Sequence, residues 1–378
     1  MTNGFAKNIT RKDPYISVVL SFRNDEYQGE SFKRFQVAID ALIYQAKHYN
    51  LNAELIIVEW NPPSDKPLLK DAISLPDDLG PLVIRIITVP HEIHKRYNLS
   101  KRISILCMIA SNVGIRRANG QFILSTCSGI LFSNKLVEFL ASISLNKSFF
   151  YRIDRCNVNR EILNCNSVEQ QIDFCKENII RIDKFFPPDP NLINYPTIHT
   201  NASGDFILMS KKYWHLLHGF PEFNKLGLHA DGLLCFMAYL AGVQQKILQD
   251  PLRLYHIDHD CRREKHIKTE NKFKSLLRSQ IYDKIKYNKF GKLIKWVSIY
   301  IHILLESCTK ISYSIFDLFL QKIFSHAHEF NMEYLYWKYK KILNSMLLKK
   351  RSYIFNDNNW GLPKEDFKET VFISNKQI

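Results

Sequence analysis

Two aspartates have sequence neighbours that suit proton transfer. Asp231, in the sequence HADG, begins a helix-like stretch that ends near Ala241. The helix dipole favours a carboxylate at this end, and such a carboxylate could take a proton from an attacking hydroxyl group. Asp205, in the sequence SGDF, is the second candidate base, and we expect it to face the same cleft. The structural alternatives are a helix N-cap for Asp231 and a turn residue for Asp205.

Two histidines three residues apart suggest a pair of ligands. His256 and His259 come at the end of a strand-like run, Arg253–Ile257, with Asp258 and Asp260 beside them. Residues i and i+3 of a strand point to opposite faces, so this spacing does not bring both rings to one ligand. We predict that His256 contacts a metal ion or a diphosphate, and the alternative is a polar strand end.

Two arginines and one cysteine complete the set of candidate chemical groups. Arg116 and Arg117 could bind a phosphate through the fork of guanidinium N–H groups, or they could lie on a solvated helix face. Cys127 could be a reactive thiol. Its sequence neighbours include no residue that would lower its pKa, so we interpret it as a packing residue.

A parallel sheet would bring these groups together. The β-rich runs of the first third are YISVVLSF (15–22), ELIIVEW (54–60), VIRIITV (83–89) and QFILS (121–125). The first two are almost continuously apolar, which is typical of strands buried on both faces. Helix-like stretches at 31–50 and 104–118 lie between the runs. Strands that alternate with helices predict a parallel sheet with crossover connections.

Ligands of such sheets bind at the carboxyl ends of the strands. The segments at these ends are Arg23-Asn24-Asp25, Glu59-Trp60-Asn61 and Thr126-Cys127-Ser128-Gly129. On sequence alone, Asp25 could instead cap the following helix, and Glu59 could be a solvated acid. The next region, 145–260, is mixed. Its strand-like and helix-like stretches are 206–209, 211–218, 231–241 and 253–257.

The order of these segments resembles that of a known enzyme family. ISVVLSFRND, ELIIVEWNPP and ASNVGIRRANGQFILSTCSGILFS follow one another as in GT-A glycosyltransferases, and they resemble the first half of bacterial, family 2-like nucleotide-sugar enzymes. The most specific part is Asn112–Leu124, which is similar to the segment N-x-G-x-x-x-A-x-G-x-aromatic-Ile-Leu before the DxD strand. NASGDF (201–206), GFPEF (219–223), HADG (229–232) and YHIDH (255–259) resemble the acceptor half.

The resemblance covers residues 15–260, and the sequence NWGL (359–362) extends it. It implies an α/β GT-A fold in residues 1–260, with a mixed, mainly parallel sheet flanked by helices. The nucleotide half would be 15–135 and the acceptor half 145–260. Residues 261–378 would then be a basic helical C-terminal extension whose tail docks back on the body.

The same resemblance implies transfer of a sugar from a nucleotide-diphosphate sugar to a glycan or lipid-linked acceptor in cell-envelope polysaccharide synthesis. Asp231, or else Asp205, would be the base. Asp25 and Glu59 would contact the base and ribose of the donor, and the implied donor site also contains Asn112, Arg116, Ser128 and Gly129. Two alternatives stay open: a catalytically inactive nucleotide- or glycan-binding relative, and a basic membrane-associated scaffold.

The metal-binding acid of the family is missing. GT-A enzymes hold Mn²⁺ or Mg²⁺ with a DxD-type acid after the fourth strand. Here residues 126–133 (TCSGILFS) contain no acid, and Gly129 stands in its place. Cys127 and Ser128 cannot replace two carboxylates for a hard cation. Three explanations stay open: stabilisation of the leaving group by Arg, Lys or His without a metal, a metal held by His256 or His259 with a carboxylate, and loss of catalysis.

The net charge of +15 is concentrated in the last third of the chain. Residues 262–295 contain twelve Lys and Arg against three acids, and residues 338–351 contain six and no acid, which together equal the whole excess. Aromatic and basic residues at 291–330 are compatible with amphipathic helices that pack on the sheet, or with an anionic membrane surface bound through 262–351. Nucleic-acid binding is not expected, because the region has no helix-turn-helix, RNP or zinc motif.

Residue usage favours the cytoplasm. The first fourteen residues are polar and lack the apolar core of a signal peptide. The eight cysteines form no CxxC pair or regular framework, which is typical of reduced thiols. The most apolar run, Trp296–Leu305, has about half of the roughly 20 residues that a membrane span needs. We expect a cytoplasmic protein, with peripheral binding to the inner face of the cell membrane as an option.

Overall fold

The computed structural model describes residues 13–26, 29–101, 103–185, 196–223, 229–259 and 339–374. The chain divides into two compact units, one of residues 1–259 with 345–378 and the other of residues 260–344. The first unit contains every predicted site residue. The predictions for 262–295 and 291–330 lie outside the described residues, as does the larger part of 262–351.

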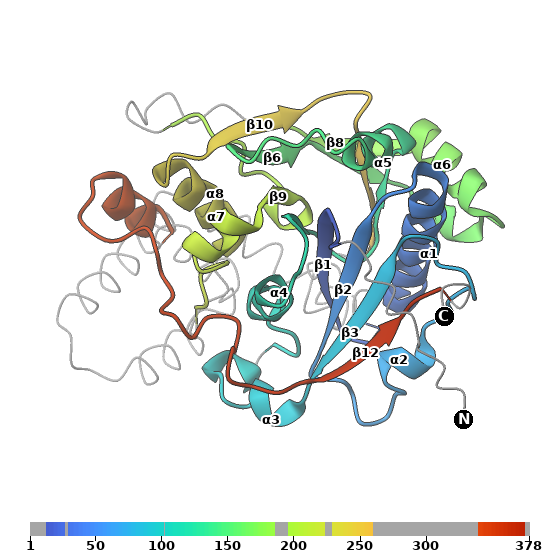
Figure 1. The fold of residues 1–378 in the computed structure, drawn as a ribbon, viewed down its shortest axis with the longest axis horizontal. Coiled ribbons are helices and arrows are strands. Elements are labelled where there is room, and N and C mark those ends of the chain that lie inside the picture. The colour runs from blue at the N-terminus through green and yellow to red at the C-terminus, as the bar shows by residue number, and fades with distance from the viewer. Residues whose placement is uncertain are drawn as a thin grey trace, which may run out of the picture. The chain divides into compact units, whose positions relative to one another are not determined.

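The described strands form two sheets (Figure 1). The eight-stranded sheet has the order β10-β6-β9-β4-β1-β2-β3-β12, and the four-stranded sheet has the order β5-β11-β7-β8. The strand bounds are β1 Ile16–Phe22, β2 Ala53–Trp60, β3 Val83–Val89, β4 Phe122–Ser125, β5 Ile130–Phe132, β6 Phe149–Ile153, β7 Arg155–Val158, β8 Ile179–Asp183, β9 Ile207–Ser210, β10 Gln244–Leu248, β11 Leu254–Ile257 and β12 Lys368–Phe372.

Helices precede or follow most of these strands. The α-helices are α1 Ser31–Tyr49, α2 Leu69–Ala72, α3 His91–His94, α4 Cys107–Arg116, α5 Asn134–Ala141, α6 Val168–Glu177, α7 Lys211–Leu216 and α8 Ala230–Leu240. The 3-10 helices are η1 Asn98–Lys101, η2 Arg160–Asn164 and η3 Ser203–Asp205. None of the helices in the described ranges is long and apolar enough to cross a membrane.

The predicted mixed, mainly parallel α/β sheet is confirmed. β1 pairs in parallel with β2 on one side and with β4 on the other, and β2 pairs in parallel with β3. β9 and β12 are antiparallel to their neighbours, which makes the sheet mixed. The apolar runs predicted as buried strands are buried as expected, since every residue of β2 is inaccessible to solvent or nearly so.

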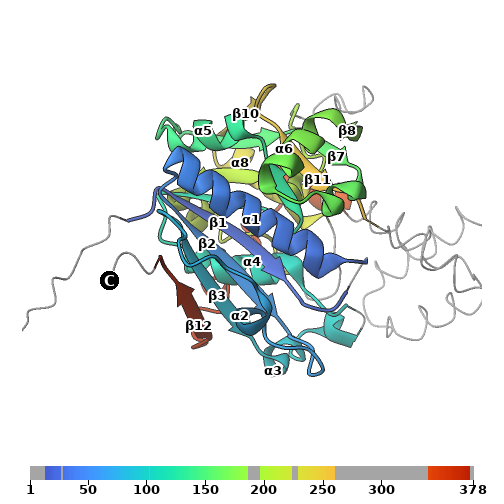
Figure 2. The ribbon, with the colours of Figure 1, turned by 90° about the vertical axis from the view of Figure 1, so that its right-hand side faces the viewer.

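Helices cover both faces of the sheet at β1, with α1 on one side and α4 on the other (Figures 1 and 2). Ile16, Val18 and Leu20 belong to one apolar core with residues of α1. Val19 points to the other face, toward α4, where a Cβ built on Gly114 would lie 2.6 Å from Val19 Cγ1. The twofold period of a strand thus buries β1 on both sides and explains why its sequence is apolar throughout.

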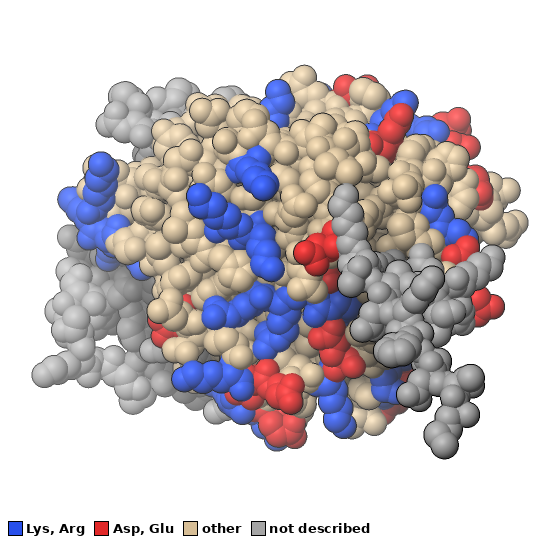
Figure 3. Space-filling model, viewed as in Figure 1, with Lys and Arg blue, Asp and Glu red and all other residues tan. Residues whose placement is uncertain are grey.

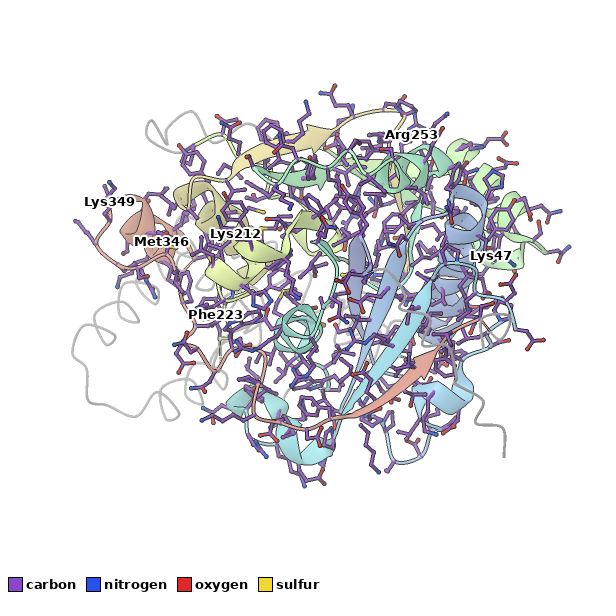
Figure 4. All side chains as sticks on the ribbon, in the orientation of Figure 1. Lys47, Lys212, Phe223, Arg253, Met346 and Lys349 are labelled. Carbon is purple, nitrogen blue, oxygen red and sulfur yellow. The ribbon has the colours of Figure 1, made fainter. Side chains whose placement is uncertain are left out.

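The tail contacts the body of the first unit. β12 pairs with the edge strand β3, and Trp360 is only 3% exposed. The guanidinium of Arg116 lies 4.9 Å from the centre of the Trp360 ring. Phe223, labelled in Figure 4, packs on Phe355 with ring centroids 5.6 Å apart.

On the face shown in Figure 3, Lys and Arg gather over α4 and α7.

Gly120 provides a test of this packing. Its N–H donates to Ser17 Oγ at 2.8 Å, and a Cβ on Gly120 would lie 2.5 Å from the backbone nitrogen of Ser17. We expect Gly120→Ala to lower the free energy of unfolding by about 3 kcal/mol, because backbone atoms cannot move aside. Urea unfolding followed by circular dichroism measures this difference.

Gly242→Ala is the matched control. Gly242 has a φ of +81°, but no described atom lies within 4 Å of its added Cβ, so only the backbone strain of about 1 kcal/mol is expected. Equal losses of stability in the two variants would contradict the close approach at Gly120.

Candidate active site

A polar cluster joins the carboxyl ends of β1, β2 and β3. Arg23, after β1, is ion-paired with Asp25, and its Nε donates a 2.6 Å hydrogen bond to the carbonyl of Asn61, after β2. Ser104 Oγ donates to Asp25 at 3.3 Å, and Asn61 Nδ2 donates to the carbonyl of Ser104 at 2.9 Å. His91 Nδ1 lies 2.7 Å from Asn61 Oδ1. Asp25 is therefore a strand-end residue and not the N-cap of α1.

Glu59 lies apart from this cluster. It is fully buried, and its two carboxylate oxygens accept hydrogen bonds from the N–H of Leu69 at 2.7 Å and from Thr88 Oγ1 at 3.0 Å. Burial raises the pKa of Glu59, and the two hydrogen bonds oppose only part of this rise. Glu59 ties α2 and β3 to β2, which corrects both expectations: it is not a solvated acid, and it presents no oxygen to a donor ribose.

Asn112 is also an interior residue. Its Nδ2 donates to the carbonyl of Phe220 and to Glu222 Oε1, both at 2.8 Å, and its Oδ1 accepts from the N–H of Phe220 at 2.8 Å. Burial raises the pKa of Glu222. The polar atoms of Asn112 are engaged in joining α4 to the turn at Phe220. This corrects the expectation that Asn112 contacts the donor.

Arg116 lies at the wrong end of the sheet for a donor phosphate. It is the last residue of α4, which leads into the start of β4, so it lies toward the amino ends of the strands. Its Nη1 donates to the carbonyl of Trp360 at 3.1 Å, and the next residue, Arg117, donates to the carbonyls of Gly361 and Leu362 at 2.8 and 2.7 Å. Both arginines hold the tail, which corrects the predicted phosphate role.

A second cluster forms at the end of β4. Thr126 Oγ1 donates to the carbonyl of Asp205 at 2.7 Å. Ser203 Oγ and the N–H of Gly204 donate to Asp231 Oδ2 at 2.9 and 2.8 Å. Hydrogen bonds thus join the end of β4, η3 and the start of α8. Gly204 links the two candidate bases, because it precedes Asp205 in the chain and its N–H donates to Asp231.

Asp231 is the more available of the two acids. It is half-buried and is the second residue of α8, whose N-cap is His229, so the interpretation of Asp231 as a plain N-cap is wrong. Its Oδ2 carries both hydrogen bonds from η3, and its Oδ1 accepts none from the described residues. The carboxylate is therefore held in one orientation with one oxygen left for a proton.

Asp205 is held by an arginine that the sequence did not single out. Arg155 Nη1 donates to Asp205 Oδ2 at 2.9 Å, and the same guanidinium also pairs with Asp183 at 2.5 Å. Burial opposes the ionisation of Asp183, but hydrogen bonds from Asn157, Arg155 and Arg181 outweigh it and lower the pKa of Asp183 to about 2. Arg155 is thus shared between two carboxylates.

A buried arginine supports the loop that carries η3. Arg152 is inaccessible to solvent, and it donates to the carbonyls of Asn201, His199 and Ser203 at 2.7, 3.3 and 3.5 Å. Burial lowers the pKa of Arg152. Through Ser203 it positions the partners of Asp231. The signal that could have identified it is a charged residue inside an apolar strand, FFYRI.

Cys127 behaves as a packing residue, as predicted. Its Sγ donates to the carbonyl of Gly204 at 3.3 Å. Burial raises the pKa of its thiol well above the ordinary value, and Asp205 and Asp231 add to the rise. The uncharged thiol is a poor nucleophile.

His256, in β11, lies next to the segment that contains Gly129, because it pairs with Ile130 of β5. The carbonyl of Gly129 accepts a 3.1 Å hydrogen bond from the N–H of Ile257, the residue after His256. The rings of His256 and His259 have centroids 5.0 Å apart, so the two histidines meet, against the expectation from their spacing. Burial lowers the pKa of His256 to about 4, which leaves its ring neutral at pH 7.

The described residues do not fit Mn²⁺ or Mg²⁺. In the described ranges, no three His, Cys, Asp or Glu side chains are grouped in a way that could hold a metal ion. Hard cations require several oxygen ligands, and one neutral, buried imidazole beside a glycine does not supply them. The role of His256 as a metal ligand stays a prediction, without a metal-binding group among the described residues.

Comparison with known proteins finds structural likeness only. No protein-family model and no curated protein matches the chain. The crystal structure of S. aureus TarS 1–349 matches with 14% identity and a TM-score of 0.39 over 64% of this chain and 60% of that chain. Its complex with UDP-GlcNAc matches with 14% identity and a TM-score of 0.40 over 68% and 61%.

The catalytic domain of Drosophila beta1,4galactosyltransferase 7, in complex with xylobiose, matches with 11% identity and a TM-score of 0.32 over 68% of this chain and 79% of that chain. This chain spans about three fifths of the TarS chain. These TM-scores are below 0.5.

The lowered pKa of Asp183 predicts that the stability of the fold depends on pH. The pKa of Asp183 is lowered on folding, so its ionised form stabilises the fold above pH 4, and this stabilisation is lost as the pH falls toward 2. We expect wild type to exceed Asp183→Asn by about 1 to 2 kcal/mol in free energy of unfolding at pH 6, discounted for partial solvent screening. Urea titrations at pH 6, 4 and 2.5 measure the difference.

Asp173→Asn, which removes an exposed carboxylate on α6, is the control. Its difference from wild type should change little over the same range. A gap between wild type and Asp183→Asn that stays constant from pH 6 to 2.5 would show that the pKa of Asp183 is not lowered on folding.

Proposed function

We propose that the protein is a GT-A, family 2-like glycosyltransferase that transfers a sugar from a nucleotide-diphosphate sugar to a hydroxyl group of a glycan or lipid-linked acceptor. The observation that carries this proposal is the presence of two polar clusters at the carboxyl ends of β1 and β4. The connection order reverses between these two strands, since β2 and β3 lie on one side of β1 and β4 on the other. Open α/β sheets bind ligands at such a switch point.

The two clusters divide the reaction between them. The cluster of Asp25, Arg23 and Asn61 offers hydrogen-bonding groups to the nucleoside. Asp231 takes the proton from the acceptor hydroxyl as its oxygen attacks the anomeric carbon. The bond between that carbon and the diphosphate oxygen breaks, and the electron pair leaves with the nucleoside diphosphate. A single displacement of this kind inverts the anomeric configuration.

Asp231 is preferred to Asp205 as the base. The Asp205 carboxylate is engaged by Arg155 at 2.9 Å, whereas Asp231 accepts only neutral donors from η3 through one oxygen. Asp231 also lies in the first turn of α8, where the helix dipole stabilises a carboxylate. Asp205 is better suited to hold Arg155 in place.

One observation favours a second candidate function. Residues 126–133 contain no acid, so the chain lacks the usual means of neutralising the departing diphosphate. A relative that binds nucleotide or glycan without turnover would show this loss. We also propose a cytoplasmic location, with the anionic inner face of the cell membrane bound through the basic residues of 262–351.

The role of Asp231 gives the test of the proposed function. Wild type and Asp231→Asn are incubated with a panel of nucleotide-diphosphate sugars and a glycan acceptor, and release of nucleoside diphosphate is measured. We expect turnover to fall about 100- to 10,000-fold in Asp231→Asn, because a general base contributes this much. Nucleotide affinity should stay within about twofold, since the amide keeps the shape of the carboxylate and its place beside η3.

Asp173→Asn serves as the control and should retain wild-type turnover. Retained transfer in Asp231→Asn would remove Asp231 as the base. Nucleotide binding without turnover in wild type would support the inactive relative, and absence of both binding and turnover across the panel would contradict the proposed function.

A further inference from the structure

The switch point of the sheet contains a basic side chain where the family has an acid. The chain leaves β4 through Ser128 and Gly129, and it leaves β1 through a loop that leads into α1. Because β1 and β4 are parallel neighbours, the two exits lie next to each other. Gly129 has a φ of +81°, and its carbonyl is bonded to β11. The hydrogen bond to β11 therefore fixes the backbone at Gly129 beside the ends of β1 and β4.

Arg34 occupies the space beside Gly129. It lies in the first turn of α1, is 5% exposed, and donates from Nη2 to the carbonyl of Gly29 at 3.2 Å. A Cβ built on Gly129 would lie 3.5 Å from Arg34 Cβ and 3.8 Å from its Nη1. The guanidinium therefore lies within a side chain's length of residue 129. This is the position at which GT-A enzymes have the metal-binding acid.

His256 points to a ligand at the same place. It is about nine-tenths buried, and its Nδ1 has no hydrogen-bond partner among the described residues. Arg34, Arg155, Asp205 and His259 are the charged or titratable groups that act on its ring. Buried polar atoms without a partner are rare in native proteins, so one beside a buried guanidinium calls for an explanation, and a bound anion supplies one.

We propose that Arg34 and His256 bind the diphosphate of the donor beside Ser128–Gly129 and replace the divalent cation. This inference rests on the proposed function. A guanidinium donates two parallel hydrogen bonds to phosphate oxygens and keeps its positive charge at any physiological pH. The neutral imidazole donates one N–H. As the bond between the sugar and the diphosphate breaks, the negative charge gained by the diphosphate oxygen is stabilised by Arg34.

The cluster contains a second basic group, Arg155, which pairs with Asp205 and Asp183 at 2.9 and 2.5 Å. A divalent cation at Gly129 would be repelled by Arg34 and would meet no carboxylate from residues 126–133. Ser128 is half-buried, which places the end of β4 within reach of a ligand from solvent.

The test measures binding of inorganic pyrophosphate, and of a nucleoside diphosphate and its nucleoside, by isothermal titration calorimetry of the full chain in EDTA. We expect wild type to bind pyrophosphate without metal. Arg34→Ala should weaken the affinity for pyrophosphate and for the nucleoside diphosphate roughly tenfold to a hundredfold, because it removes a pair of charge-assisted hydrogen bonds. Nucleoside affinity should not change. Lys33→Ala removes an exposed charge from the same turn and should leave each affinity within about twofold.

A second pair of variants does not depend on the folding of Arg34→Ala. Gly129→Ala and Gly129→Asp both place a side chain at a φ of +81°, but only the aspartate places a carboxylate near the Arg34 guanidinium. We expect Gly129→Asp to bind pyrophosphate at least about tenfold more weakly than Gly129→Ala, because it would pair with Arg34. Thermal unfolding confirms that each variant is folded.

The outcomes separate this inference from the proposed function. Pyrophosphate binding that requires Mn²⁺, or equal affinities in wild type and Arg34→Ala, would overturn the role of Arg34 even if sugar transfer is observed. Metal-free, Arg34-dependent pyrophosphate binding in a protein that binds no nucleotide-diphosphate sugar would keep the anion site and contradict the function. Equal affinities in Gly129→Ala and Gly129→Asp would also count against the site.

Discussion

The parallel pairing of β1 with both β2 and β4 determines the rest of the site. Ile16 stands opposite Ala53 in one register and opposite Phe122 in the other, so the carboxyl ends of the three strands meet at one edge. The side chains after each strand must then share that edge. This places Arg23 beside Asn61, and it brings Arg34 beside Gly129 although 95 positions separate them in the chain.

Local sequence predicted the elements that are strongly apolar or strongly periodic. The runs at 15–22 and 54–60 are buried on both faces, so composition alone identified them as β1 and β2. β5 is apolar but has only three residues, and β8 has mostly exposed side chains, so neither is identified from the sequence. β12 is a polar segment that forms a strand because the edge of β3 offers it unpaired backbone groups.

The site was less predictable, because its partners are distant in sequence. Asn112 bonds to a turn 108 positions away, and Arg116 bonds to the tail 244 positions away, so neither role is visible locally. Asp231 and Asp205 were identified from their place at element starts, and the structure brings them together. Arg34 was missed because the sequence SFKR is typical of a solvated helix face, and only the β1–β4 register places it at the switch point.

In the proposed site, the donor diphosphate binds at the switch point through Arg34 without a divalent cation. The most direct measurement is a crystal structure of the protein with a nucleoside diphosphate and excess Mn²⁺, with data collected at the manganese absorption edge. We predict phosphate oxygens within hydrogen-bond distance of the Arg34 guanidinium and of His256, and no anomalous peak between the diphosphate and the protein. A manganese peak that bridges the diphosphate to the protein beside Gly129 would contradict the account.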